Sequence, residues 1–116
     1  DIGAKSSSLI CYDQETIRAT STISFGGGDL ATDFQTNVKS ISAEIVHFIK
    51  YYQNRIGQAA IFQKIILAGG GANTPEVTSA IEGASRIKTV IGWPVIKTKT
   101  YNPKFATVIG LAMKRI

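Results

Sequence analysis

The stretch that decides the fold is IILAGGGANTP, residues 65–75. The short apolar run 64–68 ends at a glycine triplet, as a strand buried on both faces would. Thr74 then suits a helix N-cap, and Pro75 suits the first helical position, where its missing N–H costs nothing. A strand, a glycine turn and a capped helix in this order predict one unit of an α/β sheet.

The same glycine triplet is a candidate ligand loop. Glycines lack a Cβ, so a ribose or phosphate can lie against their backbone, and the helix N-terminus that follows offers N–H donors. The stretch is not a P-loop, because no Gly-Lys-Ser/Thr follows it, and it lacks the G-x-G-x-x-G spacing of dinucleotide-binding folds. The alternative is a plain turn that needs positive φ, which explains one glycine better than a triplet.

The residues before this stretch predict a hairpin and two helices. Residues 9–12 and 16–25 read as strands joined by a tight polar turn, which makes an antiparallel hairpin. Gly26-Gly27-Gly28 ends the second strand, and Asp29 opens a short helix through Phe34. A longer amphipathic helix over about 38–55 is predicted from apolar residues at helical spacing, namely Ile41, Ile45, Phe48, Tyr52 and Ile56.

After the glycine loop, the pattern returns to alternating helices and strands. Gly83 can end the helix that begins after Thr74, and residues 86–91 suit another strand. Asn102-Pro103 repeats the cap-then-proline signature and predicts a last, largely buried helix that ends near Arg115. The order ββαα-βα-βα predicts an α/β fold with a mixed sheet, in which an N-terminal antiparallel hairpin precedes strands joined by crossover helices.

Length and composition fit one globular domain. The chain has 116 residues, of which 44% are hydrophobic and 18% charged, so a disordered tail or a fibre is excluded. The apolar stretch 105–113 is shorter than the roughly 20 residues of a spanning helix, so no membrane span is expected. The single cysteine, Cys11, cannot close an internal disulfide and has no zinc-site companions, which favours a reducing, cytoplasmic setting.

The net charge of +5 is concentrated near the C-terminus, where residues 83–116 carry basic side chains and no acidic ones. These cations are scattered over several expected elements and lack the interleaved aromatic residues of a base-stacking surface. A solvated face or an interdomain contact is therefore favoured over nucleic-acid binding. His47 is expected at the solvent edge of its helix, while Tyr51 and Trp93 are candidates for a partner surface.

A second candidate ligand loop is DIGAKSSSL, residues 1–9. An aspartate at a strand tip can hold Mg²⁺ through its water shell, and Gly3 lets the backbone turn close to a phosphate. The phosphate oxygens would then accept hydrogen bonds from successive N–H groups and from the hydroxyl of Ser6 or Ser7. The alternative is a polar turn that simply begins the hairpin.

Taken together, four blocks in this order resemble the second lobe of the actin-like ATPase superfamily, which has a ribonuclease H-like fold. The blocks are DIGAKSSSL, FGGGDLATDF, ILAGGGANTPEV and NPKFATVIGLAMKRI. Within the superfamily, the chain is most similar to the PilM family of type IV pilus assembly proteins and next to the FtsA family of cell-division proteins.

The resemblance implies an ATP site with Mg²⁺. By this resemblance, Asp1 is the residue that organises the Mg²⁺ ion and its waters. The resemblance assigns no catalytic residue to this chain. The nucleotide-binding residues that it implies lie around the phosphates, beside the phosphate tail and under the adenosine: Gly3, Ala4, Lys5 and Ser6; Gly26 and Gly27; Gly69, Gly70, Gly71, Ala72 and Asn73. Glu44 lies on the helix that flanks the nucleoside in this superfamily.

The resemblance also implies that residues 1–116 form a single subdomain and a fragment of a longer protein. The first lobe of the superfamily is expected before Asp1, and a subdomain that the family inserts is missing between Phe34 and Val38. Catalysis requires water, metal and phosphates to be fixed from several directions, and misplacement by about 1 Å can cost on the order of a hundredfold in rate. We therefore expect weak ATP binding and no hydrolysis by this chain alone, while the longer parent could be a weak ATPase.

The function that the resemblance implies is nucleotide binding in a cytoplasmic platform protein for type IV pilus assembly, at the inner face of the bacterial inner membrane. Its expected partners are the cytoplasmic tail of an inner-membrane pilus protein and other platform subunits. Three alternatives remain: an FtsA-like membrane tether for cell division, a sugar or acetate kinase-type phosphotransferase of the same superfamily, and a nucleic-acid-binding module that uses the basic end.

Overall fold

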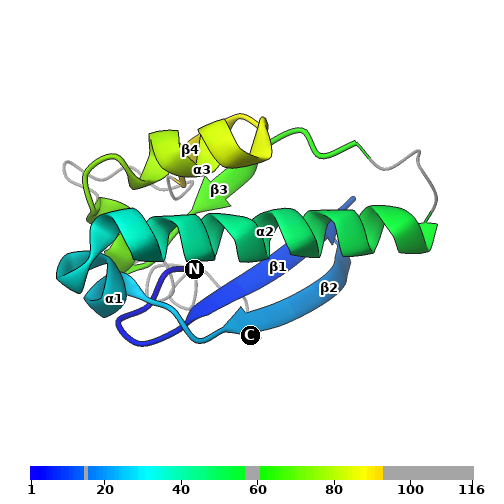
Figure 1. Cartoon of the computed structure of the whole chain (residues 1–116). Coiled ribbons are helices and arrows are strands. Elements are labelled where there is room, and N and C mark those ends of the chain that lie inside the picture. Colours follow the sequence, from blue (N-terminus) through cyan, green and yellow to red (C-terminus); the bar gives the residue numbers. More distant parts are fainter. Residues whose placement is uncertain (15, 57–60, 93–116) are drawn as a thin grey trace, which may run out of the picture.

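The computed structural model in Figure 1 describes residues 1–14, 16–56 and 61–92 as a small mixed α/β domain. In chain order, the elements are β1 (Ser7–Asp13), β2 (Thr16–Ile23), α1 (Gly27–Thr32), α2 (Phe34–Ile56), β3 (Ile65–Leu67), the 3₁₀ helix η1 (Gly70–Asn73), α3 (Val77–Ser85) and β4 (Thr89–Ile91). The antiparallel and the parallel strand pairs that the sequence predicts are both present, but among the described residues they form two separate two-stranded sheets and not the one mixed sheet that was expected.

The hairpin of β1 and β2 is confirmed. The strands pair antiparallel from Ser7 opposite Ile23 to Asp13 opposite Thr16, with an irregularity in register between Cys11 and Tyr12. Ser7, Cys11 and Ile23 are buried, whereas most of the intervening residues are exposed. One face of the hairpin therefore contributes to the core and the other faces outward.

Helix α2 is the long amphipathic helix that the apolar spacing predicts, but it begins one turn earlier than expected. Asp33 is responsible, because its Oδ1 accepts a hydrogen bond from the Thr36 N–H at 3.2 Å and so satisfies a donor of the first turn. Residues 34–38 are consequently one continuous helix. The buried side chains of α2 are Val38, Ile41, Ser42, Ile45, Ile49 and Tyr52.

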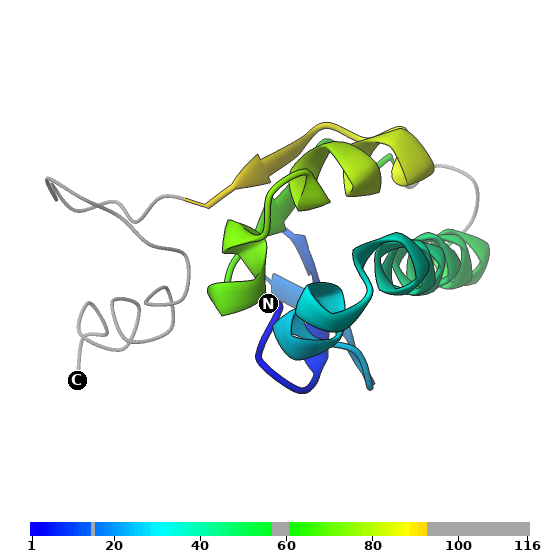
Figure 2. The same cartoon turned by 60° about the vertical axis from the view of Figure 1, so that its left-hand side comes forward.

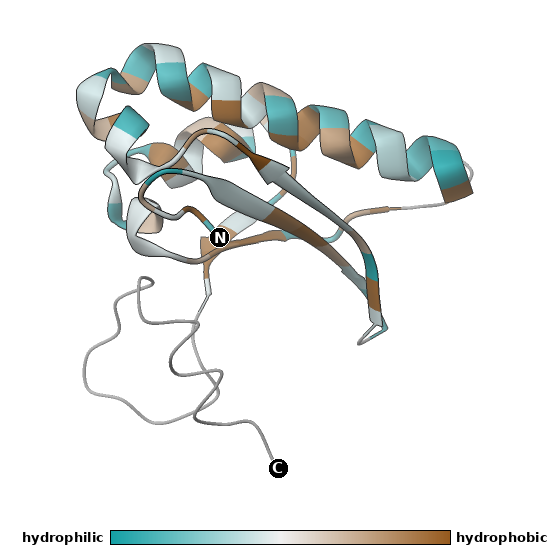
Figure 3. Cartoon of the chain, turned by 90° about the horizontal axis from the view of Figure 1, so that it is seen from below, coloured by the Kyte–Doolittle hydropathy of each residue, from teal (hydrophilic) through white to brown (hydrophobic). Residues whose placement is uncertain are grey.

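Two members of the predicted stripe on α2 are wrong. Ile49 is buried where Phe48 was expected, and Ile56 at the helix end is 51% exposed. In Figure 3, hydrophobic and hydrophilic segments alternate along α2, as they do in a helix with one buried face. The spacing thus predicts the helix and its inner face, while the end of the stripe extends past the core.

Strands β3 and β4 pair in parallel, with Ile65 opposite Thr89 and Leu67 opposite Ile91, and α3 forms the crossover between them. Figure 2 shows α3 lying along this pair, beside α2. The prediction that β3 is buried on both faces is wrong, because Leu67 is buried but Ile66 is 55% exposed. Strand β4 is also shorter than residues 86–91.

The predicted limits of α3 are wrong at both ends. Thr74 does not cap it, because the N-cap position is held by Glu76, and the Thr74 N–H instead closes the η1 turn on the Gly71 carbonyl at 3.1 Å. The helix begins at Val77, after Glu76 in the left-handed region at φ 67°. It passes through Gly83 and ends at Ser85, where Arg86 takes the left-handed conformation that was expected of the glycine.

The core lies between helices α2 and α3 and the inner faces of both strand pairs. Its buried residues form one cluster: Ile2, Ile23, Leu30, Val38, Ile41, Ile45, Ile49, Leu67, Ala72, Val77 and Ile81. Ile2 belongs to this cluster although it precedes every named element, so the N-terminal segment is anchored in the domain.

Several sequence predictions lie outside the described residues. These are the last helix after Asn102, the candidate Trp93 and most of the basic C-terminal residues. Among residues 1–14, 16–56 and 61–92, none of the helices combines the length and apolar character that crossing a membrane requires.

Candidate functional site

The structure brings together three segments that are far apart in the sequence. The Gly27 N–H donates to the Gly3 carbonyl at 2.7 Å, and the Gly28 N–H donates to the Ala4 carbonyl at 2.9 Å. From the other side, the Gly71 N–H donates to the Ile2 carbonyl at 2.9 Å. We refer to residues 1–6, 26–28 and 69–73 as the glycine junction. Figure 2 shows the N-terminal turn between α1 and the segment that follows β3.

Close backbone contact explains the glycines of the junction. A Cβ at Gly26 would lie 2.7 Å from both the carbonyl carbon and the oxygen of Ala4, and one at Gly71 would lie 2.8 Å from the Ile2 Cβ. Gly69 also adopts φ 88°, a conformation that favours glycine. Any larger residue at these positions would push the segments apart, so the glycines are required whether or not a ligand binds.

Exposure divides the predicted nucleotide-binding residues into two groups. The buried group, which holds the segments together, is Gly26, Gly69, Gly71 and Ala72. Gly3 and Gly27 are half-buried. The exposed group, which a ligand can reach, is Asp1, Ala4, Lys5, Ser6, Gly70 and Asn73. The surface of the junction is therefore formed mainly by the N-terminal turn.

This N-terminal turn presents hydrogen-bond donors. The Gly3 N–H donates to the Ser6 carbonyl at 3.0 Å and closes the turn. The backbone N–H groups of Ala4, Lys5 and Ser6 have no acceptor within the described part of the chain. Consecutive N–H groups in a tight turn, together with the ammonium group of Lys5, suit an anion such as a phosphate.

Of the two serines expected near a phosphate, only Ser6 is accessible. The Ser7 side chain is buried, and its hydroxyl donates to the Phe25 carbonyl at 2.6 Å. Of the two hydroxyls expected to donate to a phosphate, only that of Ser6 lies where a ligand can reach it. The Ser7 hydroxyl instead links β1 to Phe25, just after β2.

The sequence reasoning missed a role for Asp29 in this junction. Its carboxylate accepts a hydrogen bond from the Gly26 N–H at 2.8 Å, and its carbonyl accepts one from the Asn37 side-chain amide at 2.8 Å. Asp29 thus joins the glycine segment 26–28 to α1 and α2. An acidic residue in the first turn of a helix, three positions after the glycine that precedes it, is the signal that could have identified this contact.

A metal would depend on few protein ligands here. No group of three or more His, Cys, Asp or Glu side chains able to hold a metal ion is found within residues 1–14, 16–56 and 61–92. Asp1 is exposed at the junction, as a residue that contacts Mg²⁺ through water would have to be. Mg²⁺ commonly keeps several waters and takes one or two carboxylates plus substrate phosphates, so Asp1 fits such an ion only together with a bound phosphate.

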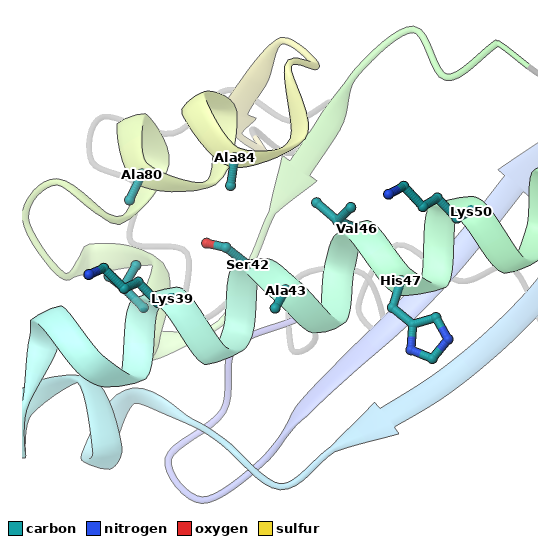
Figure 4. Close-up of a pocket in the computed structure, with 9 residues that line it drawn as sticks. Lys39, Ser42, Ala43, Val46, His47, Lys50, Ala80 and Ala84 are labelled. Carbon is teal, nitrogen blue, oxygen red and sulfur yellow. The ribbon is translucent and has the colours of Figure 1, made fainter.

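Two grooves along α2 lie apart from the glycine junction. One, of about 550 Å³, lies between α2 and α3, with Val46 and Ala84 in its lining and Lys39 and Lys50 near its ends (Figure 4). The other, of about 410 Å³, is lined in part by Phe62. Neither includes a residue of the junction.

The remaining candidates on α2 are all exposed. Glu44 does not line either groove and faces solvent. His47 is exposed, as expected, and in Figure 4 its ring points away from α3. Tyr51 is 52% exposed, and its hydroxyl accepts a hydrogen bond from Arg55 Nη1 at 2.9 Å.

Comparison with known proteins assigns no family to the chain: no family model matches it, and no curated protein matches it.

Proposed function

We propose that this chain binds the phosphates of a purine nucleotide, ATP with Mg²⁺, at the exposed surface of the glycine junction. The observation that carries the proposal is the meeting of the segments at residues 1–6, 26–28 and 69–73, with the turn Gly3–Ser6 at their surface. In the sequence these segments are separated by tens of residues, and each was a candidate ligand loop or a glycine turn.

The N-terminal turn would make the main contacts with the phosphates. The N–H groups of Ala4, Lys5 and Ser6 can donate to phosphate oxygens, and the Lys5 ammonium adds charge. Asp1 would orient waters of a Mg²⁺ ion that the phosphates also hold. The bound ion would screen charge on the phosphate oxygens.

The buried glycines would act indirectly. They let the turn rest on two backbone segments, so its N–H groups are held in place before the ligand arrives. A site that is organised in advance loses less conformational freedom on binding. One such face cannot hold a nucleophilic water as well, so binding without hydrolysis is expected of this chain.

The wider role rests on the resemblance alone. It supports a nucleotide-binding subdomain of an actin-like platform protein for type IV pilus assembly, at the cytoplasmic face of the inner membrane, with the cytoplasmic tail of a pilus membrane protein as partner. ATP binding would be the property shared with the cell-division and phosphotransferase alternatives. A binding assay therefore tests the site and not the choice among these families.

The experiment compares Mg-ATP binding by the chain with that by Lys5→Glu and a matched control, Lys39→Glu. Both lysines are exposed, so each variant changes the net charge equally, but Lys39 lies on α2 outside the junction. ATP is titrated into each protein while the amide chemical shifts are recorded by NMR, and the largest shift changes should fall at residues 3–6. Lys5→Glu should weaken binding at least tenfold, about 1.4 kcal/mol, while the control changes it less than about twofold.

Two outcomes would contradict the proposal. The first is that ATP at millimolar concentration shifts none of the amides of residues 3–6. The second is that Lys5→Glu and Lys39→Glu weaken binding equally, which would indicate general attraction to a basic protein. Inorganic phosphate and adenosine, titrated separately, would show which part of ATP the junction contacts.

A further inference from the structure

The two grooves along α2 meet and form one trough on the side of the helix that faces α3. Val46 and Lys50 line both grooves, so the two hollows share a wall. On α2 the lining extends over residues 38–53, a rise of about 22 Å along an α-helix. We refer to the surface bounded by these residues and, opposite them, by residues 61–62 and 80–87 as the α2 trough.

The centre of the α2 trough is apolar. Val46 is half-buried on α2, and Ala80 and Ala84 point toward α2 from α3 (Figure 4). Toward the C-terminal end of α2, Phe62 and Ile61 line the trough in place of these alanines. The Ile61 side chain is 85% exposed. A partner that fills the trough would therefore remove apolar surface from water, which favours binding.

The charged side chains along the trough are basic. Lys39 and Lys50 are exposed and lie eleven positions apart on α2, or about 16 Å along the helix. Neither lysine forms an ion pair with a described residue. Within residues 1–14, 16–56 and 61–92, no aspartate or glutamate lines the trough. Positive charge on either side of an apolar centre matches a ligand that carries negative charge at the same spacing.

The walls of the trough favour a helical ligand over an extended one. Helices α2 and α3 use their backbone N–H and carbonyl groups internally, so they present mainly side chains to a ligand. An extended peptide would place its own backbone polar groups against Val46 and Ala84 without partners, which costs free energy. An α-helix pairs these groups within itself, and one of about 15 residues would span the trough.

Other segments of this protein match the charge of the trough poorly. Residues 93–116 contain five basic side chains and no acidic one. Two copies of a chain with a net charge of +5 repel each other. The basic trough therefore favours an acidic partner over residues 93–116 or a second copy of the chain.

We propose that the α2 trough binds an acidic amphipathic α-helix of a partner protein, whose apolar face covers Val46 and whose carboxylates lie near Lys39 and Lys50. The spacing of the two lysines implies carboxylates about three turns apart on one face of the partner helix. Between them, apolar residues are expected at helical spacing. The inference is independent of nucleotide binding, because the α2 trough and the glycine junction are lined by different residues.

The test uses a synthetic peptide with blocked ends, about 16 residues long and built mainly from alanine and glutamine. It carries leucines on one helical face and, on the same face, two glutamates about three turns apart. A second peptide has lysine in place of both glutamates. Each peptide is titrated into the whole chain while the amide chemical shifts of Val46, Ala80 and Ala84 are recorded by NMR.

Two variants place a new carboxylate at neighbouring positions of α3. Ala84→Glu adds it inside the trough, where it repels an acidic ligand and occupies space. Gly83→Glu, the matched control, adds it to an exposed position of α3 that does not line the trough. Both wild-type residues are exposed, so both variants should fold, and circular dichroism checks that they do.

We expect the acidic peptide to shift the amides of the trough and to gain helicity as it binds. Ala84→Glu should weaken this binding at least about tenfold, while Gly83→Glu should change it less than about twofold. The lysine peptide should bind at least about tenfold more weakly than the acidic one. Added salt should reduce that difference, because charges at an exposed rim are screened.

The proposal is overturned if the acidic peptide at millimolar concentration shifts none of the trough amides. Equal binding of the two peptides would also overturn it, since the trough would then not select charge. Equal weakening by Ala84→Glu and Gly83→Glu would place the peptide elsewhere. Nuclear Overhauser contacts between Ala84 and residues 93–116, or a dimer that Ala84→Glu dissociates, would show that the chain itself fills the trough and that no partner helix does.

Discussion

Replacing Gly26 with alanine tests whether the glycine junction is held by close backbone contact. Gly26 has φ −145° and ψ −169°, an extended conformation that alanine adopts without strain. The substitution therefore changes one thing, the space between residues 26–28 and the N-terminal turn of residues 3–6. Its new Cβ would lie 2.7 Å from the Ala4 carbonyl carbon and oxygen, which are backbone atoms that cannot rotate away.

The expected cost can be estimated from the contacts that must open. Moving the segments apart weakens the hydrogen bonds from Gly27 to Gly3 and from Gly28 to Ala4. At about 0.5–1.5 kcal/mol each, these two bonds amount to about 1–3 kcal/mol. The alanine gains back about 0.4–1 kcal/mol by restricting the unfolded chain, whereas residual overpacking adds about 1–3 kcal/mol. Together these figures span about 1–6 kcal/mol, so we expect Gly26→Ala to lower the free energy of unfolding by about 3 kcal/mol, the middle of that range.

The matched control is Gly83→Ala. Gly83 lies within α3, and a Cβ there would meet no atom within 4 Å. Alanine should therefore stabilise the helix by about 0.5–1 kcal/mol. Urea unfolding followed by circular dichroism, with linear extrapolation to water, measures both changes. The reasoning is refuted if Gly26→Ala unfolds within about 0.5 kcal/mol of the wild type, the range of a neutral surface substitution.

Two further predictions concern single side chains. Cys11 is 4% exposed and burial raises the pKa of its thiol, so iodoacetamide should modify it far more slowly in the folded chain than in urea, and equal rates would contradict its burial. The Thr36 hydroxyl and N–H lower the pKa of Asp33. Because the folded pKa is below the unfolded value of about 3.9, this stabilisation is present above that pH and is lost as the pH falls through the folded pKa. Asp33→Ala should lower the unfolding temperature near neutral pH, with a difference from wild type that shrinks in acid; a constant difference would argue against the carboxylate.

Periodicity predicts the elements better than their ends. The stripe that includes Ile41 and Ile45 identifies α2, because a helix with one buried face needs apolar residues at that spacing. The start of α2 depends instead on one local hydrogen bond, between Asp33 and Thr36, which an apolar stripe does not register. Gly83 has the residue type that commonly ends a helix, but α3 continues past it to Ser85.

The failure at Thr74 has a tertiary cause. Threonine followed by proline is a good local signal for a helix start, and local propensity alone would place the cap there. In the structure, Gly71 lies against Ile2 and its carbonyl accepts the Thr74 N–H, so residues 70–73 form a 3₁₀ turn. A contact with a residue near the N-terminus thus sets where α3 begins, and no sequence window around Thr74 contains that information.

The glycine junction was predictable in part. The two glycine triplets and the Asp1 turn were identified as candidates from the sequence, and the resemblance implied that they share a site. Which of their residues are exposed was not predictable, because burial of Gly69 and Gly71 depends on how closely Ile2 approaches. The part played by Asp29 was likewise hidden, since an acidic residue in a first turn usually serves only its own helix.

The close packing of the junction and its proposed ligand are compatible explanations of the same glycines, and they can be separated by experiment. Gly26 lies beneath the N-terminal turn, so a change there should reduce stability and ATP binding together. Lys5 lies on the exposed surface and forms no ion pair with a described residue, so Lys5→Glu should reduce binding while stability changes little. If Lys5→Glu changes neither property, close packing alone accounts for the glycines and the turn is simply the start of the hairpin.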